Sequence, residues 1–366
     1  MAHPASVARI QRPARCVVTP GDPVADRGDI LRLAGHLPGS PGAERFAKYY
    51  DRSPHGPPAV FLAHEPTSGR TVGMAALLPT SLRVRGKRVG AAISGDFAID
   101  PEHRGFGPAL ALQRASLKTL PEHGWMCAFG CPNELSEPIV KRVGFEEVGP
   151  LTRYVKVLRT RMLIDMYVGR PGLARMLSAS AAVTADPALR VISREWRGRR
   201  AGLTFERPAV FDERFADVWE ATARRYLITG DRGARALNWK FELDSGRPPE
   251  YSIFAAVEGN GRVAGYVVYL VKDGVWHIFD IATLDSRDAV DGLLAGFLAE
   301  ARHEGALGVA LLCLGRLGEL GKRLRSFGFL ARVEDKRLRV YLPDGQAGPD
   351  PLQPDSWFFV MGDDDF

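Results

Sequence analysis

The sequence predicts a mixed α/β (α+β) fold built from two related halves. Short apolar runs typical of strands alternate with helical segments, which is the pattern of a mixed sheet covered by helices. The order of these segments in residues 15–158 recurs at similar spacing in residues 197–366. The chain has 366 residues, 45% of them hydrophobic and 25% charged, which is long for one domain. We therefore expect two domains, each with a mixed, mostly antiparallel sheet flanked by helices.

The first half begins after residues 1–14, a Pro-, Ala- and Arg-rich stretch that we expect to be a disordered tail. A strand at 15–19 comes next, followed by a helix over 23–37, which Asp22 can cap and which has Pro23 at its first position. Residues 43–51 predict a second helix. Pro66–Gly69 form a turn cluster between two apolar runs, so these runs predict strands at 58–64 and 71–84.

A tight polar turn, Arg85–Arg88, leads into a third long strand. We interpret the tip of this turn as solvated. The remaining elements of the first half are a strand at 89–100, a helix at 108–120, a strand at 125–130, a helix at 134–143 and a strand that ends at 158.

The second half repeats this order. Its expected elements are helices at 211–228 and 234–241, strands at 251–257, 263–271 and 275–283, a helix at 287–303, a strand at 306–314 and a helix at 316–326. Gly73 and Gly144 of the first half correspond to Gly265 and Gly328 of the second. Residues 159–196 are apolar at helical spacing but broken by Gly and Pro, so we expect linker helices there.

Composition excludes several classes of protein. No run reaches the ~18 apolar residues of a membrane span, and the amino terminus lacks a secretory signal core, so we expect a cytoplasmic protein. The four cysteines form no CxxC pair and lie beside no histidine cluster, so neither a disulfide framework nor a metal site is expected. The net charge is +6, but Lys and Arg are dispersed, and we expect no nucleic-acid partner.

The segment that points to chemistry is Asp100–Ala109, DPEHRGFGPA, between a predicted strand and a predicted helix. Glycines let a backbone approach a ligand closely, and the N–H groups of a first helical turn have no partner inside the helix. A helix start also favours negative charge by ~0.3–1 kcal/mol, and Arg104 adds a full positive charge. The segment therefore predicts an anion site.

These residues resemble the signature of the GNAT acetyltransferases: Arg or Gln, two variable residues, Gly, one variable residue, then Gly or Ala. Here those positions are Arg104, Gly107 and Ala109. Downstream, Asn133, Ser136 and the pair Gly144–Phe145 follow at the family's spacing. The resemblance covers 16–158 and, more loosely, the second half. It implies acetyl-CoA, or another acyl-CoA, as cosubstrate and an amine-bearing acceptor as partner.

The resemblance also implies roles for particular residues. Backbone groups that hold the pyrophosphate would come from Arg104, Gly105, Phe106, Gly107, Pro108 and Ala109. Phe97, Ala98 and Ile99 would offer backbone groups to the pantetheine arm, and Asn133 would lie beside it. Pro108 has no N–H, but we expect it at the first helical position, where proline is tolerated.

The residues for acid–base chemistry are less clearly marked. The family often has a tyrosine seven residues after the asparagine as general acid, and this chain has Val140 there; Tyr154 is a possible substitute, although it also fits a packed strand residue. Asp96, on the strand that would flank the thioester, is our candidate general base. An Asp that anchors a strand bulge or binds a substrate ammonium fits equally well. His103 fits a solvent-facing residue or a phosphate contact better than a base.

The stretch of the second half that corresponds to the loop contains no glycine. Its Asp285 and Asp288 would repel a pyrophosphate. We therefore expect that 197–366 is a GNAT-like domain without coenzyme, and that the chain resembles tandem-GNAT proteins with a degenerate second half. The predicted function is acyl-CoA-dependent N-acyltransfer. Two alternatives stay open: a Fem-type aminoacyltransferase that uses aminoacyl-tRNA, and a non-catalytic CoA-binding module. The sequence identifies neither the acceptor nor the oligomeric state.

Overall fold

The computed structural model describes residues 16–37, 42–162, 202–343 and 350–364. The chain divides into two compact units. The first comprises Met1–Pro79, Ala91–Phe145 and Tyr341–Gln346, and the second Thr80–Gly90, Glu146–Val340 and Ala347–Phe366. The tail at 1–14 and most of the expected linker at 159–196 lie outside the described residues.

The first unit is built on five strands that neighbour one another in chain order. They are β1 (Val17–Gly21), β2 (Ala59–His64), β3 (Thr71–Val84), β4 (Lys87–Ile99) and β5 (Trp125–Gly130). β2 pairs antiparallel with both β1 and β3. Arg85 and Gly86 connect β3 to β4 with φ of 50° and 78°, which is the positive-φ pair of a two-residue hairpin turn. This turn, with residues 80–90, belongs to the second unit.

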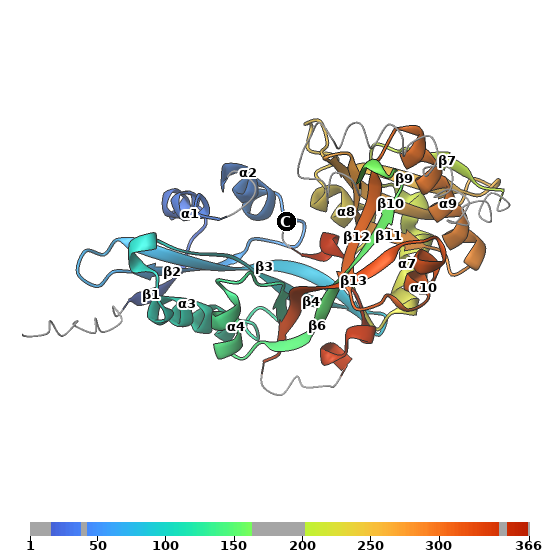
Figure 1. Ribbon diagram of the computed structural model, residues 1–366. Coiled ribbons are helices and arrows are strands. Elements are labelled where there is room, and N and C mark those ends of the chain that lie inside the picture. Colours follow the sequence, from blue (N-terminus) through green and yellow to red (C-terminus); the bar gives the residue numbers. More distant parts are fainter. Residues whose placement is uncertain (1–15, 38–41, 163–201, 344–349, 365–366) are drawn as a thin grey trace, which may run out of the picture. The chain divides into compact units, whose positions relative to one another are not determined.

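Helices cover both faces of the first unit's strands (Figure 1). On one face are α1 (Arg27–Ala34), α2 (Gly42–Phe46) and a π-helical turn, Ala47–Asp51; on the other are α3 (Phe106–Lys118) and α4 (Glu137–Arg142). Gly73 of β3 allows a close approach of α3, because a Cβ there would lie 3.2 Å from both the Ala98 carbonyl oxygen and the Leu112 side chain. Helix α3 therefore packs closely on β3 and on the end of β4.

The second unit has a sheet in the order β13-β6-β12-β11-β10-β9-β7. The parallel pair is β11 with β12, and the other neighbouring pairs are antiparallel. β8 lies off this path and pairs with the end of β3 and with β14. The strands are β6 (Glu146–Val157), β7 (Thr204–Glu206), β8 (Ile228–Gly230), β9 (Ser252–Val257), β10 (Val263–Lys272), β11 (Val275–Thr283), β12 (Gly308–Leu314), β13 (Leu330–Tyr341) and β14 (Trp357–Phe358).

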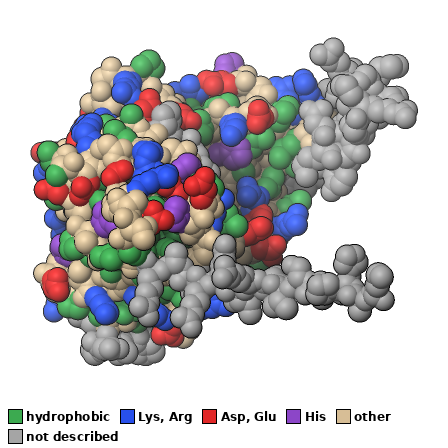
Figure 2. All heavy atoms as spheres, turned by 90° about the vertical axis from the view of Figure 1, so that its left-hand side faces the viewer, with side chains coloured by type: hydrophobic (Ala, Val, Ile, Leu, Met, Phe, Trp, Pro, Cys, Tyr) green, Lys and Arg blue, Asp and Glu red, His purple; other side chains and the backbone are tan. Residues whose placement is uncertain are grey.

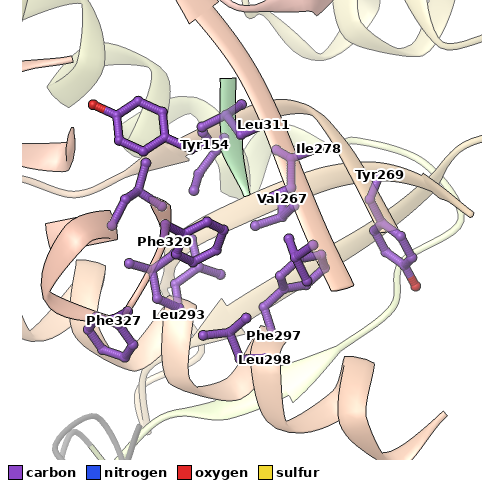
Figure 3. Close-up of a cluster of buried hydrophobic side chains, with 14 of the residues drawn as sticks. Tyr154, Val267, Tyr269, Ile278, Leu293, Phe297, Leu298, Leu311, Phe327 and Phe329 are labelled. Carbon is purple, nitrogen blue, oxygen red and sulfur yellow. The ribbon is translucent and has the colours of Figure 1, made fainter. Parts of the chain in front are cut away.

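Strand β10 lies between two buried hydrophobic clusters, one on each face of the sheet. Val267 and Tyr269 contribute to one buried cluster, whereas Tyr266 and Val268 contribute to another, as the two-residue period of a strand requires. The first cluster includes side chains of α9 (Arg287–His303) and α10 (Gly318–Ser326), and Figure 3 shows Leu293, Phe297 and Leu298 in it. The second includes side chains of α7 (Ala216–Arg225) and α8 (Ala234–Lys240). Because both faces are covered, residues 263–269 of β10 are all buried.

The expected fold class is confirmed, and the predicted strands at 71–84, 125–130 and 275–283 and the helix at 287–303 have the expected bounds. The compact units divide the chain differently from the predicted halves, because β6 pairs with β12 and β13 and so lies in the second unit. The boundary at 158 therefore stays a prediction about sequence repeats. None of the helices described is long and apolar enough to cross a membrane.

Candidate active site

The site begins where β4 continues past the end of β5. β5 stops at Gly130, where a Cβ would lie 3.5 Å from the Ser94 carbonyl oxygen, and β4 runs on to Ile99. The predicted arm-binding residues Phe97, Ala98 and Ile99 are therefore on the part of β4 that extends beyond the end of β5. A ligand that carries amide groups could form hydrogen bonds with this part of β4 as a neighbouring strand would.

The glycine-containing loop follows directly. Pro101–His103 form a single 3₁₀ turn, Gly105 precedes the helix with extended backbone, and α3 begins at Phe106. Arg104 and Gly105 are exposed. The N–H groups of Phe106 and Gly107 lie in the first turn, where no carbonyl of the same helix can accept them.

The prediction for Pro108 was wrong in detail, because this residue is third in α3 and not first. The reason is that Phe106 and Gly107 already have helical backbone, so the helix starts two residues earlier. Pro108 still lies in the first turn, where its missing N–H removes no bond within the helix. Ala109 is buried at the base of the same turn.

Asn133 follows β5 and organises the start of α4. Its side-chain oxygen accepts hydrogen bonds from the backbone of Leu135 (3.1 Å) and Ser136 (3.0 Å) and from the Ser136 hydroxyl (3.0 Å). Asn133 itself is exposed. Its observed contacts explain why an Asn–x–x–Ser pattern suits this position, and its place beside a pantetheine arm stays a prediction.

Asp96 lies inside β4 just before the arm-binding residues. It is buried and has a φ of +45°. Its Oδ1 accepts from Arg45 Nε in a short ion pair, and its Oδ2 accepts from the Tyr50 hydroxyl at 2.7 Å. Both oxygens are therefore engaged by residues of α2 and the π-helical turn.

Val140, which replaces the family's tyrosine, and Tyr154, the possible substitute as general acid, are both buried. Val140 is buried in a cluster with Leu117, Leu120 and Phe145. Tyr154 lies in β6 of the second unit, where its hydroxyl donates to the Arg316 carbonyl oxygen at 3.0 Å and accepts from Arg325 at 3.1 Å. Burial raises the pKa of Tyr154 above its ordinary value.

His103, in the 3₁₀ turn, is engaged as well. Its Nε2 lies 3.5 Å from a carboxylate oxygen of Glu65. Hydrogen bonds from Ser68 and then from His103 lower the pKa of Glu65. His103 thus anchors the loop to the β2–β3 turn.

In the second unit, the carboxyl-terminal segment lies against the ends of β11 and β12. β11 and β12 are paired from Val275 with Gly308 to Ile278 with Leu311. Beyond that point Val360 bridges to Cys313, and Leu314 donates to the Phe359 carbonyl oxygen at 2.9 Å. A Cβ on Gly362 would lie 2.8 Å from the Phe279 carbonyl oxygen of β11. Backbone of residues 359–362 thus fills the space beside the ends of β11 and β12.

Arg45 and Tyr50 were missed from the sequence. They are five residues apart, and a regular α-helix would place them about 140° apart around its axis. The π-helical turn at Ala47–Asp51 is what lets both reach Asp96. No local pattern of residues signals such a turn, so the sequence offered no indication of this contact.

Surface charge and possible metal ligands were the other features that could mark a site. On the face shown in Figure 2, Lys and Arg side chains are interspersed with Asp and Glu. Over the described ranges, no group of three or more His, Cys, Asp or Glu residues is placed to hold a metal ion.

Comparisons with solved structures show what this fold is similar to. A probable N-acyltransferase from Enterococcus faecalis is 17% identical with a TM-score of 0.62, over 89% of this chain and 72% of that one. A GCN5-related N-acetyltransferase from Anabaena variabilis is 16% identical with a TM-score of 0.60, over 90% and 73%. N-myristoyltransferase from Saccharomyces cerevisiae with bound myristoyl-CoA is 13% identical with a TM-score of 0.54, over 93% and 84%.

No curated protein matches the chain at a significant level. The family model described as acetyltransferase (GNAT) domain matches residues 29–148. That range contains β4, the glycine loop, α3 and β5, which are the elements that form the site. Residues 29–148 of this chain are a GNAT domain.

Proposed function

We propose that the first unit binds an acyl-CoA and catalyses transfer of its acyl group, acetyl or another, to an amine of an acceptor. The observation that carries the proposal is the continuation of β4 past β5 into a glycine loop and the start of α3. Extended backbone suits an amide-containing arm, and a helix start beside Arg104 suits a pyrophosphate. The two features follow each other within ten residues, as one elongated ligand would require.

In this proposal each part of the site has one task. The amides of Phe106 and Gly107 bind the pyrophosphate together with Arg104, and the backbone of 97–99 binds the arm. Bound acyl-CoA supplies the acyl group as a thioester. The general-base role of Asp96 remains a prediction from its strand position, and it would require Arg45 or Tyr50 to release a carboxylate oxygen.

The second unit is proposed to bind no coenzyme. Its loop carries Asp285 and Asp288, and residues 359–362 fill the gap beside β11. Gly265 supports the proposed relationship between the halves. A Cβ at Gly265 would lie 2.9 Å from the Ala282 carbonyl oxygen and 3.1 Å from the Leu293 side chain. A Cβ at Gly73 would likewise meet the Ala98 carbonyl oxygen and the Leu112 side chain.

Acetyl-CoA titration by calorimetry, followed by an assay for free thiol with a panel of amines, tests the proposal. We expect binding, and thiol release that depends on one class of amine. Binding without release under any amine would favour the non-catalytic CoA-binding module. Absence of binding, with release of amino acid from aminoacyl-tRNA, would favour the Fem-type alternative.

A further inference from the structure

Asp96 has a backbone conformation that is unusual inside a strand. Its φ of +45° lies in the left-handed region, which residues other than glycine rarely adopt. The other described non-glycine residues with positive φ lie in turns or at helix ends: Arg85, Glu242, Asp273 and Leu317. A left-handed residue bends a strand and redirects the residues that follow, and it persists only where its surroundings hold it.

The surroundings of Asp96 are suited to hold it. Arg45 is bound to one carboxylate oxygen and Tyr50 to the other. Burial, and then the negative charge of Asp96, raise the pKa of Tyr50 well above its ordinary value, so its phenol stays protonated and continues to donate. Two charge-assisted bonds of this kind fix the carboxylate in one orientation.

A second buried carboxylate is fixed at the other end of the arm-binding segment. Asp100 accepts from Arg32 Nη1 at 2.8 Å and from Arg70 Nη2 at 3.0 Å, and His36 lies 3.4 Å away. Residues 97–99 therefore lie between two anchored aspartates. Both anchors include an arginine from the helices between β1 and β2.

The same arrangement recurs in the second unit, beside an irregularity of β11. Asp280 accepts from Arg232 Nε at 3.0 Å and from the Tyr266 hydroxyl at 3.1 Å, and the register of β10 with β11 shifts next to it. The Arg232 and Asp280 side chains are 1% and 2% exposed, so neither can exchange a proton with a substrate. An Asp held by Arg and Tyr is thus present where the loop has no glycine, which indicates that this cluster maintains strand geometry.

We propose that Asp96 is a positioning residue: with Arg45 and Tyr50 it holds the bend in β4 that presents Phe97–Ile99 to the coenzyme arm, and it does not take the proton from the acceptor amine. This inference rests on the proposed function, because it assigns the coenzyme arm to that segment. A positioning role predicts that loss of Asp96 weakens acetyl-CoA binding. A general-base role predicts that it lowers kcat and changes the pH profile of kcat.

The test compares Asp96→Asn and Tyr50→Phe with the parent and with Asp51→Asn. The last is a matched control, since it makes the same Asp→Asn exchange at an exposed carboxylate in the turn that also contains Tyr50. This carboxylate pairs with Arg27 at 3.6 Å. Acetyl-CoA affinity is measured by calorimetry, folding by thermal unfolding, and the pH profile of kcat with the amine that the thiol assay identifies.

We expect Asp96→Asn to weaken acetyl-CoA binding by about tenfold or more, and Tyr50→Phe to weaken it less, with the pH profile of kcat unchanged and Asp51→Asn like the parent. If Asp96→Asn does not fold, Tyr50→Phe, which keeps the ion pair, decides by the same comparison. The inference is overturned if affinity is equal to the parent's while kcat falls by the ~10²–10⁴-fold of a lost general base and the rise of rate with pH disappears. A parent that binds no acetyl-CoA would overturn the proposed function as well, whereas unchanged affinity in both variants would overturn the positioning role alone.

Discussion

Gly107 is a residue at which we expect one substitution to remove ligand binding while the fold stays intact. We predict that Gly107→Glu abolishes acetyl-CoA binding, because a side chain and a negative charge would enter the position of the pyrophosphate at the start of α3. Calorimetry measures the affinity, and thermal unfolding shows whether the fold is intact.

Gly259→Glu is the matched control for that charge. It lies in a turn of the second unit, where a Cβ would have no atom within 4 Å and φ is not positive. This variant should bind acetyl-CoA like the parent. Equal affinity for Gly107→Glu and Gly259→Glu would show that the loop is not the site.

Tyr226 makes stability depend on alkaline pH. Burial raises the pKa of its phenol to about 12, its hydroxyl lies 3.4 Å from the Leu317 carbonyl oxygen, and its ring packs on Phe358. In the unfolded chain the phenol loses its proton at its ordinary pKa near 10. Between these values only the folded state keeps the proton, so the free energy of unfolding falls as pH rises, by up to about 1.4 kcal/mol per pH unit.

Urea unfolding at pH 9 and pH 11.5 measures this effect. We expect Tyr226→Phe to lose less stability than the parent between the two pH values, because phenylalanine has no proton to release. Other buried tyrosines, such as Tyr266, contribute equally to both proteins and cancel in the comparison. An equal loss in parent and variant would contradict the burial of this hydroxyl.

At the scale of elements, the carboxyl-terminal segment closes the gap beside β11. Trp357 and Phe358 pair with β8, Phe359 and Val360 join β12, and Asp363 binds Arg232 at 2.7 Å. All five are buried. The segment is therefore part of the core of the second unit.

We predict that Gly362→Ala destabilises the second unit by about 1–3 kcal/mol, because its methyl group would meet backbone that cannot yield. A Cβ there would lie 2.8 Å from the Phe279 carbonyl oxygen and 3.0 Å from the Phe241 ring. Chemical denaturation measures the change, with Gly259→Ala as control at an open position. Equal stability of the two variants would show that residues 359–362 do not fill this gap.

At the scale of the whole molecule, we predict that one chain binds one CoA. The first unit offers Arg104 and the amides at the start of α3, whereas the second offers Asp285 and Asp288, and its gap is filled. A pyrophosphate moved to the second loop would lose its amides and gain like-charged neighbours, and each tenfold of affinity requires only ~1.4 kcal/mol.

Titration with acetyl-CoA at known protein concentration measures the stoichiometry. We expect a value near one, and none for Gly107→Glu. A stoichiometry near two, or a single site that survives Gly107→Glu, would contradict the assignment of the coenzyme to the first unit.

The sequence by itself determined the elements and the loop. Apolar runs bounded by turns placed β3, β5, β10 and β11 within a residue, since strand patterns and glycine turns are properties of neighbouring residues. The spacing Arg104–Gly107–Ala109 and Asn133–Gly144 predicted the family for the same reason. Even there, the start of α3 moved by two residues because Phe106 and Gly107 could join the helix.

Only the tertiary structure decided which residues act together. The Arg45–Asp96–Tyr50 cluster depends on a π-helical turn. The place of β6 depends on its pairing with β12 and β13. The gap beside β11 is filled by a segment in which Val360 bridges to Cys313. These contacts connect residues about 50 to 190 positions apart. The free energy of such contacts comes from burial and complementary charge in three dimensions, which the local order of residues does not encode.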